Sequence, residues 1–230
     1  MAFDPYYSRP EVSNSDLTAL KYKLFPQLNF ISEKAKLEAF RKGTLVDALI
    51  TEPEAFNYYK KSVGDYTYTD DEIKWGMEMR KALIKYSQGS KAEQQFMAYV
   101  LKYAETQKAF VNPAMKFDVG FMQFELPTRC KFDWWMPGLK AGLDLKTTSA
   151  TTYKQFLDEV EFIGWQRSRA WYADLVNQLN PAWGNNDGIC AISKKNFKVF
   201  FLKMKRGDKY FENGRKEYTD LAFKMWCLTQ

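Results

Sequence analysis

A change of pattern at about residue 117 constrains the fold more than any other feature of the sequence. Before this point apolar residues recur at helical spacing, and after it short apolar segments alternate with turn signals. The spacing predicts helices at about residues 13–23, 32–49, 70–86 and 91–108, a loop at 62–69, strands at 117–126, 129–136 and 141–147, helices at 151–161 and 162–179, strands at 189–193 and 197–204, and a last helix at 208–226. Turns are expected at Pro127-Thr128 and Pro137-Gly138.

This order of elements predicts an α/β fold in which helices flank a central mixed sheet. A chain of 230 residues suits one domain, since domains typically hold about 100–200 residues. We therefore expect a single domain over residues 1–230. Its parts would be a mostly helical part over 1–110, a catalytic sheet core over 117–205 and a C-terminal helix over 208–228.

The composition excludes several classes of site. Histidine is absent, so the chain cannot hold a catalytic triad with histidine, a histidine-ligated zinc or a histidine general base. Its three cysteines, Cys130, Cys190 and Cys227, form no CxxC pair, which argues against a zinc ribbon or an iron–sulfur cluster. Any metal would be held by oxygen atoms, which is typical of Mg²⁺ or Mn²⁺.

The ends and the charge of the chain bear on where it acts. Residues 1–5 lack the basic and apolar regions of a signal peptide, and no apolar run approaches the about 20 residues that span a bilayer. With unpaired cysteines as well, we expect a cytoplasmic protein with no membrane partner. The net charge of +6 is compatible with a polyanionic partner such as DNA.

Two aspartates and a lysine fall together if residues 129–147 form a hairpin. With Gly138-Leu139 as a two-residue turn, Asp133 lies opposite Asp144, and Lys146 lies two residues further on the same face. Facing carboxylates repel each other, and a divalent cation that takes both as ligands removes this cost. The Lys146 ammonium could then orient water or stabilise charge on a phosphate. The pattern therefore predicts metal-dependent chemistry.

An acidic-x-lysine tripeptide is weak evidence when taken alone. The same pattern occurs at Glu72-Ile73-Lys74, where we expect only a charged helix start whose removal costs a few tenths of a kcal/mol. The prediction rests instead on the second aspartate and on the small or apolar neighbours of Asp144 in residues 141–145. A structural cluster of ion pairs is the alternative that these residues leave open.

The same segments resemble a known family. Asp133 followed by Asp144-Leu145-Lys146-Thr147-Thr148 is similar to the motif of the PD-(D/E)xK nuclease superfamily. Three more segments resemble its exodeoxyribonuclease VIII and phage lambda exonuclease branch, namely residues 13–17, residues 43–56 and Phe162-Ile163-Gly164-Trp165-Gln166 with Ala170 and Tyr172. The resemblance spans about residues 11–205 and implies a restriction-endonuclease-like core.

The resemblance also implies roles for individual residues. Asp133 and Asp144 would hold Mg²⁺ or Mn²⁺ together with the backbone carbonyl of Leu145. Lys146 would be the catalytic lysine, and Gln166 would lie near the scissile phosphate or the DNA end.

The sequence departs from the family pattern at two positions. Asp47 stands where the family has a histidine, and an aspartate there can still bind the metal or a metal-bound water. Ile163 replaces the tyrosine that precedes the glutamine by three residues. Asp118 is a candidate for the acidic residue that the family has before its first strand.

Basic residues near these motifs are candidates for DNA contacts. Arg167 and Arg169 flank Gln166 on the predicted helix, and Lys194 and Lys195 begin a basic stretch that could follow phosphates. A solvated strand edge protected by lysines is an equally good interpretation of that stretch.

The function implied by the resemblance is hydrolysis of DNA by a metal-dependent exonuclease. We expect a 5′-to-3′ exonuclease on duplex ends that acts in phage or bacterial recombination, with a single-strand annealing protein as partner. By analogy with that branch we also expect a homo-oligomer that forms a ring around DNA. The alternatives are a structure-specific endonuclease and a catalytically inactive nucleic-acid-binding domain.

Overall fold

The computed structural model describes residues 6–29 and 31–230. Residues 1–5, considered above for a signal peptide, lie outside the described residues. The first half holds helices α1 (Asn14–Leu24), α2 (Glu33–Thr51), α3 (Asp70–Ser87) and α4 (Ala92–Tyr103), the 3₁₀ turns η1 (Pro26–Leu28) and η2 (Pro53–Ala55), and a small hairpin of β1 (Ser62–Val63) and β2 (Tyr66–Thr67). The four expected helices are confirmed, and the expected loop at 62–69 contains the hairpin.

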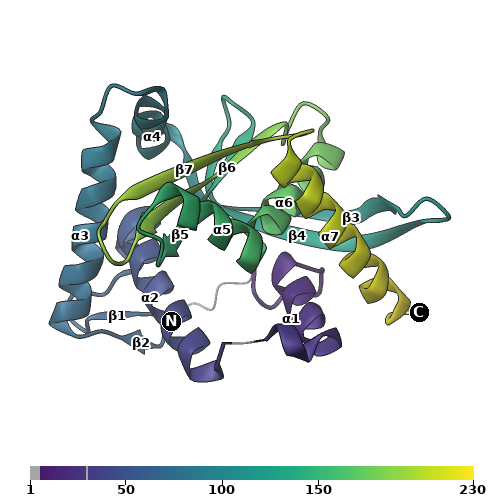
Figure 1. The fold of residues 1–230 in the computed structure, drawn as a ribbon, viewed down its shortest axis with the longest axis horizontal. Coiled ribbons are helices and arrows are strands. Elements are labelled where there is room, and N and C mark those ends of the chain that lie inside the picture. The colour runs from purple at the N-terminus through teal and green to yellow at the C-terminus, as the bar shows by residue number, and fades with distance from the viewer. Residues whose placement is uncertain (1–5, 30) are drawn as a thin grey trace.

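The second half consists of three strands, two helices, two more strands and a last helix (Figure 1). Its elements are β3 (Glu105–Asp118), β4 (Gln123–Met136), β5 (Ala141–Thr148), α5 (Tyr153–Ile163), α6 (Trp165–Leu179), β6 (Asn186–Ser193), β7 (Val199–Lys205) and α7 (Lys209–Cys227). The main sheet has the order β3-β4-β5-β6-β7, in which β5 and β6 are parallel and all other neighbours are antiparallel. The fold is therefore α/β with a mixed sheet, as the sequence predicts.

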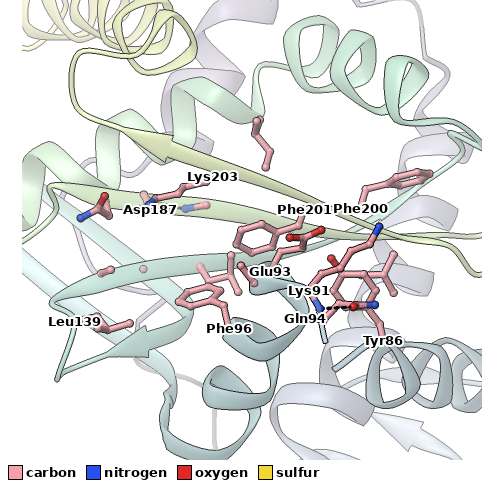
Figure 2. Close-up of a pocket in the computed structure, with 18 of the residues that line it drawn as sticks. Tyr86, Lys91, Glu93, Gln94, Phe96, Leu139, Asp187, Phe200, Phe201 and Lys203 are labelled. Carbon is pink, nitrogen blue, oxygen red and sulfur yellow. Dashed lines mark hydrogen bonds between the residues drawn. The ribbon is translucent and has the colours of Figure 1, made fainter. Parts of the chain in front are cut away.

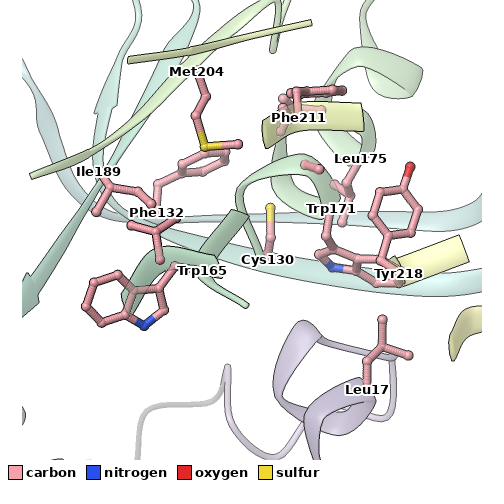
Figure 3. Close-up of a cluster of buried hydrophobic side chains, with 14 of the residues drawn as sticks. Leu17, Cys130, Phe132, Trp165, Trp171, Leu175, Ile189, Met204, Phe211 and Tyr218 are labelled. Atoms are coloured by element: carbon pink, nitrogen blue, oxygen red, sulfur yellow. The ribbon is translucent and has the colours of Figure 1, made fainter. Parts of the chain in front are cut away.

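Helices cover both faces of this sheet. One hydrophobic cluster joins residues of β3, β4, β6 and β7 to α1, α5, α6 and α7, and Figure 3 shows Phe132, Ile189 and Met204 of the strands near Trp165 and Trp171 of α6. A second cluster joins the opposite face to α2, α3 and α4. Of the described helices, none is long and apolar enough to cross a bilayer.

Local chemistry explains where several helices begin. Ser13 and Asp16 form a reciprocal capping box at the start of α1, and Thr69 and Glu72 form another at the start of α3. Between α5 and α6 the chain turns at Gly164, whose φ of 82° lies in the left-handed region that glycine adopts without strain.

The first two strands differ from the prediction. β3 begins at Glu105, inside the segment expected to be helical, and β4 runs through Pro127-Thr128, where a turn was expected. The register between β3 and β4 shifts between Asn112 and Met115, so Pro113 and Pro127 both fall at the bulge. Because proline cannot donate to a strand ladder, a bulge is the position in which an internal strand tolerates it. The two prolines therefore mark an irregularity in a continuous hairpin.

Candidate active site

The β4–β5 hairpin brings the two predicted carboxylates together. The observed pairs Trp134 with Leu143 and Met136 with Ala141 have the register that the sequence predicts. The ladder stops before the next pair, and there the Leu145 backbone N–H donates to Asp133 Oδ2 at 2.7 Å. A carboxylate thus takes the place of the carbonyl that would continue the ladder.

The sheet is irregular on both sides of Asp133. Phe132 packs in the cluster under α6, whereas Trp134 packs in the cluster on the opposite face. On β3, Gln107 lies between the partners of these two residues and has a φ of 52°, a conformation that is costly for a residue with a side chain. Irregular strand positions of this kind are enriched beside active sites, where they redirect side chains.

Asp144 lies between two cations at the start of this irregular region. It is 5% exposed, its Oδ2 is 2.5 Å from Lys146 Nζ, and its Oδ1 is 2.7 Å from Arg169 Nη1. Asp144 Oδ2 nevertheless has no hydrogen-bond partner of suitable geometry among the described residues. A buried carboxylate oxygen in this state is a ready ligand for a cation.

Burial and neighbouring charges shift the pKa values of the three groups in the cluster. Burial raises the pKa of Asp133 well above its usual range, and the nearby Asp144 and Asp47 carboxylates raise it further. Burial also acts on Asp144, but Lys146 and Arg169 outweigh it and hold the pKa of Asp144 below its usual range. Burial disfavours the charged form of Lys146, yet Asp144 and Asp133 raise its pKa. Of the two carboxyl groups, Asp133 is therefore the harder to ionise and Asp144 the easier.

A cavity of about 210 Å³ opens beside this cluster. Asp144 and Lys146 form one wall, and the other walls are formed by α1, the α5–α6 turn, and α6 through Asn14, Ser15, Thr18, Tyr22, Ile163, Gly164, Trp165, Arg167, Ser168 and Tyr172. The expected N-terminal motif and the segment around Gln166 thus meet at Asp144 and Lys146. Gln166 itself is buried and is not among the residues lining this cavity.

Asp47 of α2 approaches the cluster from another side. Its Oδ1 accepts a hydrogen bond from Thr51 Oγ1 at 2.8 Å, and its Oδ2 accepts one from Gln107 Nε2 at 3.1 Å. Burial raises its pKa, against the opposing effect of these bonds and of the positive charges of Lys146 and Lys131. Asp47 is therefore within electrostatic reach of the site, but it is held by side chains of its own surroundings.

The two arginines that the sequence predicts to contact DNA are buried. Arg167 is 2% exposed and donates to Asn14, Thr18 and Glu217, so it connects α6 to α1 and α7. Arg169 is fully buried between Asp144 and Asp187. Both guanidinium groups bind protein carboxylates, and Arg167 also lines the cavity beside Asp144, so contact of either arginine with DNA stays a prediction.

The remaining predicted positions lie elsewhere on the sheet. Lys194 and Lys195 lie in the turn between β6 and β7, where the Lys194 backbone N–H donates to the Thr148 carbonyl. Asp118 lies at the tip of the β3–β4 hairpin and accepts from the Gly120 backbone N–H and from Gln123. Asp118 is the last residue of β3 and pairs with Gln123 at the start of β4, so it does not lie at the carboxylate cluster.

The oxygen donors at the cluster fit a hard divalent cation. Mg²⁺ is usually bound by one or two carboxylates and several waters, and Asp133, Asp144 and the Leu145 carbonyl offer such a set. Within residues 6–29 and 31–230, no group of three or more acidic or cysteine side chains converges closely enough to hold a metal alone.

Sequence reasoning missed three residues of this region. The sequence predicts a helix at Gln107 and a DNA contact for Arg169, and it assigns no role to Asp187, which precedes the predicted strand at 189–193. The signals are weak: Asp187 lies shortly before the apolar segment 189–192, and Arg169 lies directly before the apolar segment 170–173.

Figure 2 shows a larger cavity, with a volume of about 950 Å³, whose lining shares no residue with that of the smaller one. It is lined by α4 and by the first residues of β5 and β6 together with β7, and Phe96 of α4 meets Phe201 of β7 edge to face at 5.5 Å. Its lining includes Asp187 and Glu93 but neither Asp133, Asp144 nor Lys146. The smaller cavity is therefore the better candidate for the chemistry.

Comparisons with known proteins add little to this geometry. No protein-family model matches the chain, and no curated protein matches it. A solved structure titled "Crystal structure of SSO0001" has 8% sequence identity, covers 64% of this chain and 84% of its own, and has a TM-score of 0.34. A likeness of this size carries no argument about fold or function.

Proposed function

We propose that this chain is a divalent-cation-dependent deoxyribonuclease that hydrolyses DNA phosphodiester bonds. The observation that carries the proposal is the convergence of Asp133, Asp144 and Lys146 where the β4–β5 ladder ends. Two carboxylates and an ammonium beside a cavity are the charges that phosphodiester hydrolysis requires, namely ligands for a cation and a positive group near the phosphate.

The topology supports a restriction-endonuclease-like core for this proposal. Strands β3, β4 and β5 form an antiparallel meander, and α5 and α6 then lead to β6, which pairs in parallel with β5. This arrangement places Asp133 and Asp144 on adjacent strands and covers their side of the sheet with α6.

Asp144, Asp133 and the Leu145 carbonyl would hold Mg²⁺ or Mn²⁺. The bound cation would supply Lewis-acid stabilisation of the phosphate and a more acidic water. Lys146 acts beside it as a hydrogen-bond donor, because the neighbouring carboxylates raise its pKa and keep the ammonium charged. A fixed positive group of this kind stabilises charge that develops in the transition state more than charge in the ground state.

The substrate follows from the resemblance and from the charge of the chain. We propose a 5′-to-3′ exonuclease that acts on duplex DNA ends in phage or bacterial recombination, with a single-strand annealing protein as partner and a homo-oligomeric assembly. The net charge of +6 favours binding to a polyanion. Gln166 keeps its proposed place near the DNA end only if its side chain turns toward the cavity when DNA binds.

End-labelled linear duplex DNA, incubated with Mg²⁺ and sampled over time, tests the proposal. We expect mononucleotides or short products from linear DNA, no cleavage of covalently closed circles, loss of activity with a chelator, and recovery with Mg²⁺ or Mn²⁺. Asp144→Asn should weaken the response to Mg²⁺ while leaving the shape of the site intact. Cleavage that persists without any divalent cation would contradict the proposed site.

The same assay separates the alternatives. Cleavage of closed circles or of branched DNA would favour a structure-specific endonuclease. DNA binding without cleavage at any Mg²⁺ or Mn²⁺ concentration would favour an inactive nucleic-acid-binding domain, in which Asp144, Lys146 and Arg169 form only a buried cluster of ion pairs.

A further inference from the structure

We infer that Asp187 is a positioning residue of the proposed nuclease site, and that it fixes the metal-binding carboxylate of Asp144 through the guanidinium of Arg169. The inference rests on the proposed function, because it concerns how that site holds its cation. It adds a residue on β6 and a residue on α6 to a site otherwise built from β4 and β5.

The first contact of this relay is between Arg169 and Asp144. Arg169 Nη1 lies 2.7 Å from Asp144 Oδ1, on a side chain that is fully buried. This contact is an ion pair, because Arg169 Nη1, like Asp144 Oδ2, has no hydrogen-bond partner of suitable geometry among the described residues. Arg169 lies at one carboxylate oxygen of Asp144 and leaves the other, Oδ2, next to Lys146. This division of the two oxygens presents one of them to a cation.

The second contact fixes Arg169 itself. Its Nε donates to Asp187 Oδ1 at 2.8 Å and its Nη2 donates to Asp187 Oδ2 at 3.2 Å, so two nitrogens meet two oxygens. Paired contacts of this type define the plane of the guanidinium as well as its position. The group also lies over the ring of Tyr172 at 4.4 Å and near that of Phe132 at 5.1 Å, which restricts its rotation further.

The strand register explains why a residue on β6 can reach the site. Asp144 pairs with Ile189 in the parallel β5–β6 ladder, and Asp187 precedes Ile189 by two residues. Side chains two residues apart on a strand share a face, so Asp187 and Asp144 both point toward α6. Arg169 lies on α6 above both, and it can therefore bridge them.

The energetics argue for a role beyond folding. A buried pair of charges gains little net stability over apolar residues of similar size, because both groups must be removed from water. The Asp187 carboxylate is about as buried as Arg169, and the Gly188 backbone N–H also donates to it, at 2.6 Å. A rigid chain of charges that ends on the proposed metal ligand is explained if it holds that ligand in place, as partners behind metal ligands generally do.

The chain contains a matched control for this network. Asp174, also on α6, accepts hydrogen bonds from Arg215 at 2.8 and 3.0 Å, from Tyr218 at 2.6 Å and from Arg206. It is a buried aspartate bound by arginines, like Asp187, but its partners lie on α7 and in the turn before it. Its loss should affect stability without affecting the site.

Mn²⁺ binding to the full chain, followed by electron paramagnetic resonance of the free ion, tests the relay. We expect Asp187→Asn to weaken Mn²⁺ binding about 10–100-fold and to raise the Mg²⁺ concentration for half-maximal cleavage by a similar factor. DNA binding without metal should stay within about twofold of the unmodified protein, because Asp187 does not face the cavity beside Asp144. Asp174→Asn should lower the melting temperature and leave Mn²⁺ binding unchanged.

Arg169→Lys is the second variant, used in place of Asp187→Asn if that variant does not fold. Lysine keeps the charge but cannot bridge two carboxylates with fixed geometry, so Mn²⁺ binding should again weaken. If the folded variant binds Mn²⁺ as the unmodified protein does, or if Asp174→Asn weakens binding equally, the relay is overturned. If the unmodified protein neither binds Mn²⁺ nor cleaves DNA, the proposed function itself fails, which is a separate result.

Discussion

Glu72-Ile73-Lys74 and Asp144-Leu145-Lys146 have the same acidic-x-lysine pattern and opposite surroundings. Glu72 is the third residue of α3, where it accepts from the Thr69 backbone N–H at 3.0 Å and binds Arg41, while Lys74 is exposed. Asp144 and Lys146 lie on a strand, 2.5 Å apart, beside one cavity. The difference is one of backbone geometry, because residues i and i+2 share a face in a strand and diverge in a helix.

The chemistry of an acidic-x-lysine tripeptide therefore depends on the secondary structure in which it lies. In α3 the acidic residue caps a helix and the lysine points to solvent, so the two charges act separately. In β5 they form a unit, and the ladder register adds Asp133 to it. Substitutions at the two tripeptides and at Asp47 therefore test this contrast.

Lys146→Ala should have the largest effect. It removes the ammonium beside the phosphate but leaves both carboxylates, so cation and DNA should still bind. Loss of one preorganised stabilising group typically slows the chemical step about 10²–10³-fold, and we expect cleavage at least about 100-fold slower under single-turnover conditions. A variant that unfolds, or that cleaves within a few-fold of the unmodified rate, would show that this tripeptide is structural as well.

Asp47→Ala should have an intermediate effect. Asp47 accepts a hydrogen bond from Gln107, the strained residue of β3 opposite Asp133, so the substitution removes the support of Gln107. It also removes a negative charge that raises the pKa of Asp133. We expect cleavage about 10-fold slower, as for other residues that support metal ligands. Gel-based cleavage assays across Mg²⁺ concentrations measure this, and an unchanged profile would make Asp47 a residue of local structure only.

Glu72→Ala should reduce stability and leave the cleavage rate unchanged. Arg41 lowers the pKa of Glu72 to about 2, and the Thr69 backbone N–H contributes to this shift. The contact with Arg41 raises the expected cost above that of a simple charged helix start, to about 1 kcal/mol for the lost cap and ion pair. A folded-state pKa below the unfolded value of about 4.3 contributes stability above that pH, and this contribution is lost as the pH falls toward 2. Thermal melts of both proteins at pH 7 should therefore differ by a few degrees, and at pH 2 by much less.

Lys74→Ala should have the smallest effect. The side chain is exposed on α3, and substitutions of this type usually change the free energy of unfolding by less than about 0.5 kcal/mol. Parallel melting and cleavage measurements serve as the control for Lys146→Ala. A loss of cleavage here would mean that the wrong tripeptide was assigned to the site.

Local signals in the sequence predict much of the fold. The capping boxes that begin helices at Ser13 and Thr69 each involve only four consecutive residues. The β4–β5 register is likewise local, because it follows from one short turn. The start of β3 is different, because its residues gain strand structure only by pairing with β4. Taken alone, Pro127 indicates a turn. In the structure it lies opposite Pro113, where the β3–β4 register shifts, and a pairing between residues this far apart in sequence cannot be predicted from local signals.

The candidate site divides in the same way. The proximity of Asp133 and Asp144 follows from a hairpin register, so the sequence is sufficient to predict it. The roles of Arg169 and Asp187 depend on how α6 lies across the β5–β6 ladder, which no spacing in the sequence specifies. Arg169 was therefore assigned to DNA on its charge, although its charge is neutralised within the protein.

The proline-containing bulge gives the β3–β4 hairpin two ladders in series. The ladder beyond the bulge joins Met115–Asp118 to Gln123–Leu126, and the ladder before it joins Glu105–Asn112 to Thr128–Trp135 next to the site. A break in pairing interrupts the cooperative loss of hydrogen bonds, so fraying that begins at the tip stops at the prolines. Amide hydrogens near Asp133 should consequently exchange with the slow global opening, and those of the tip with a faster local opening. The tip of the hairpin can therefore lose its hydrogen bonds while the segment that carries Asp133 stays paired.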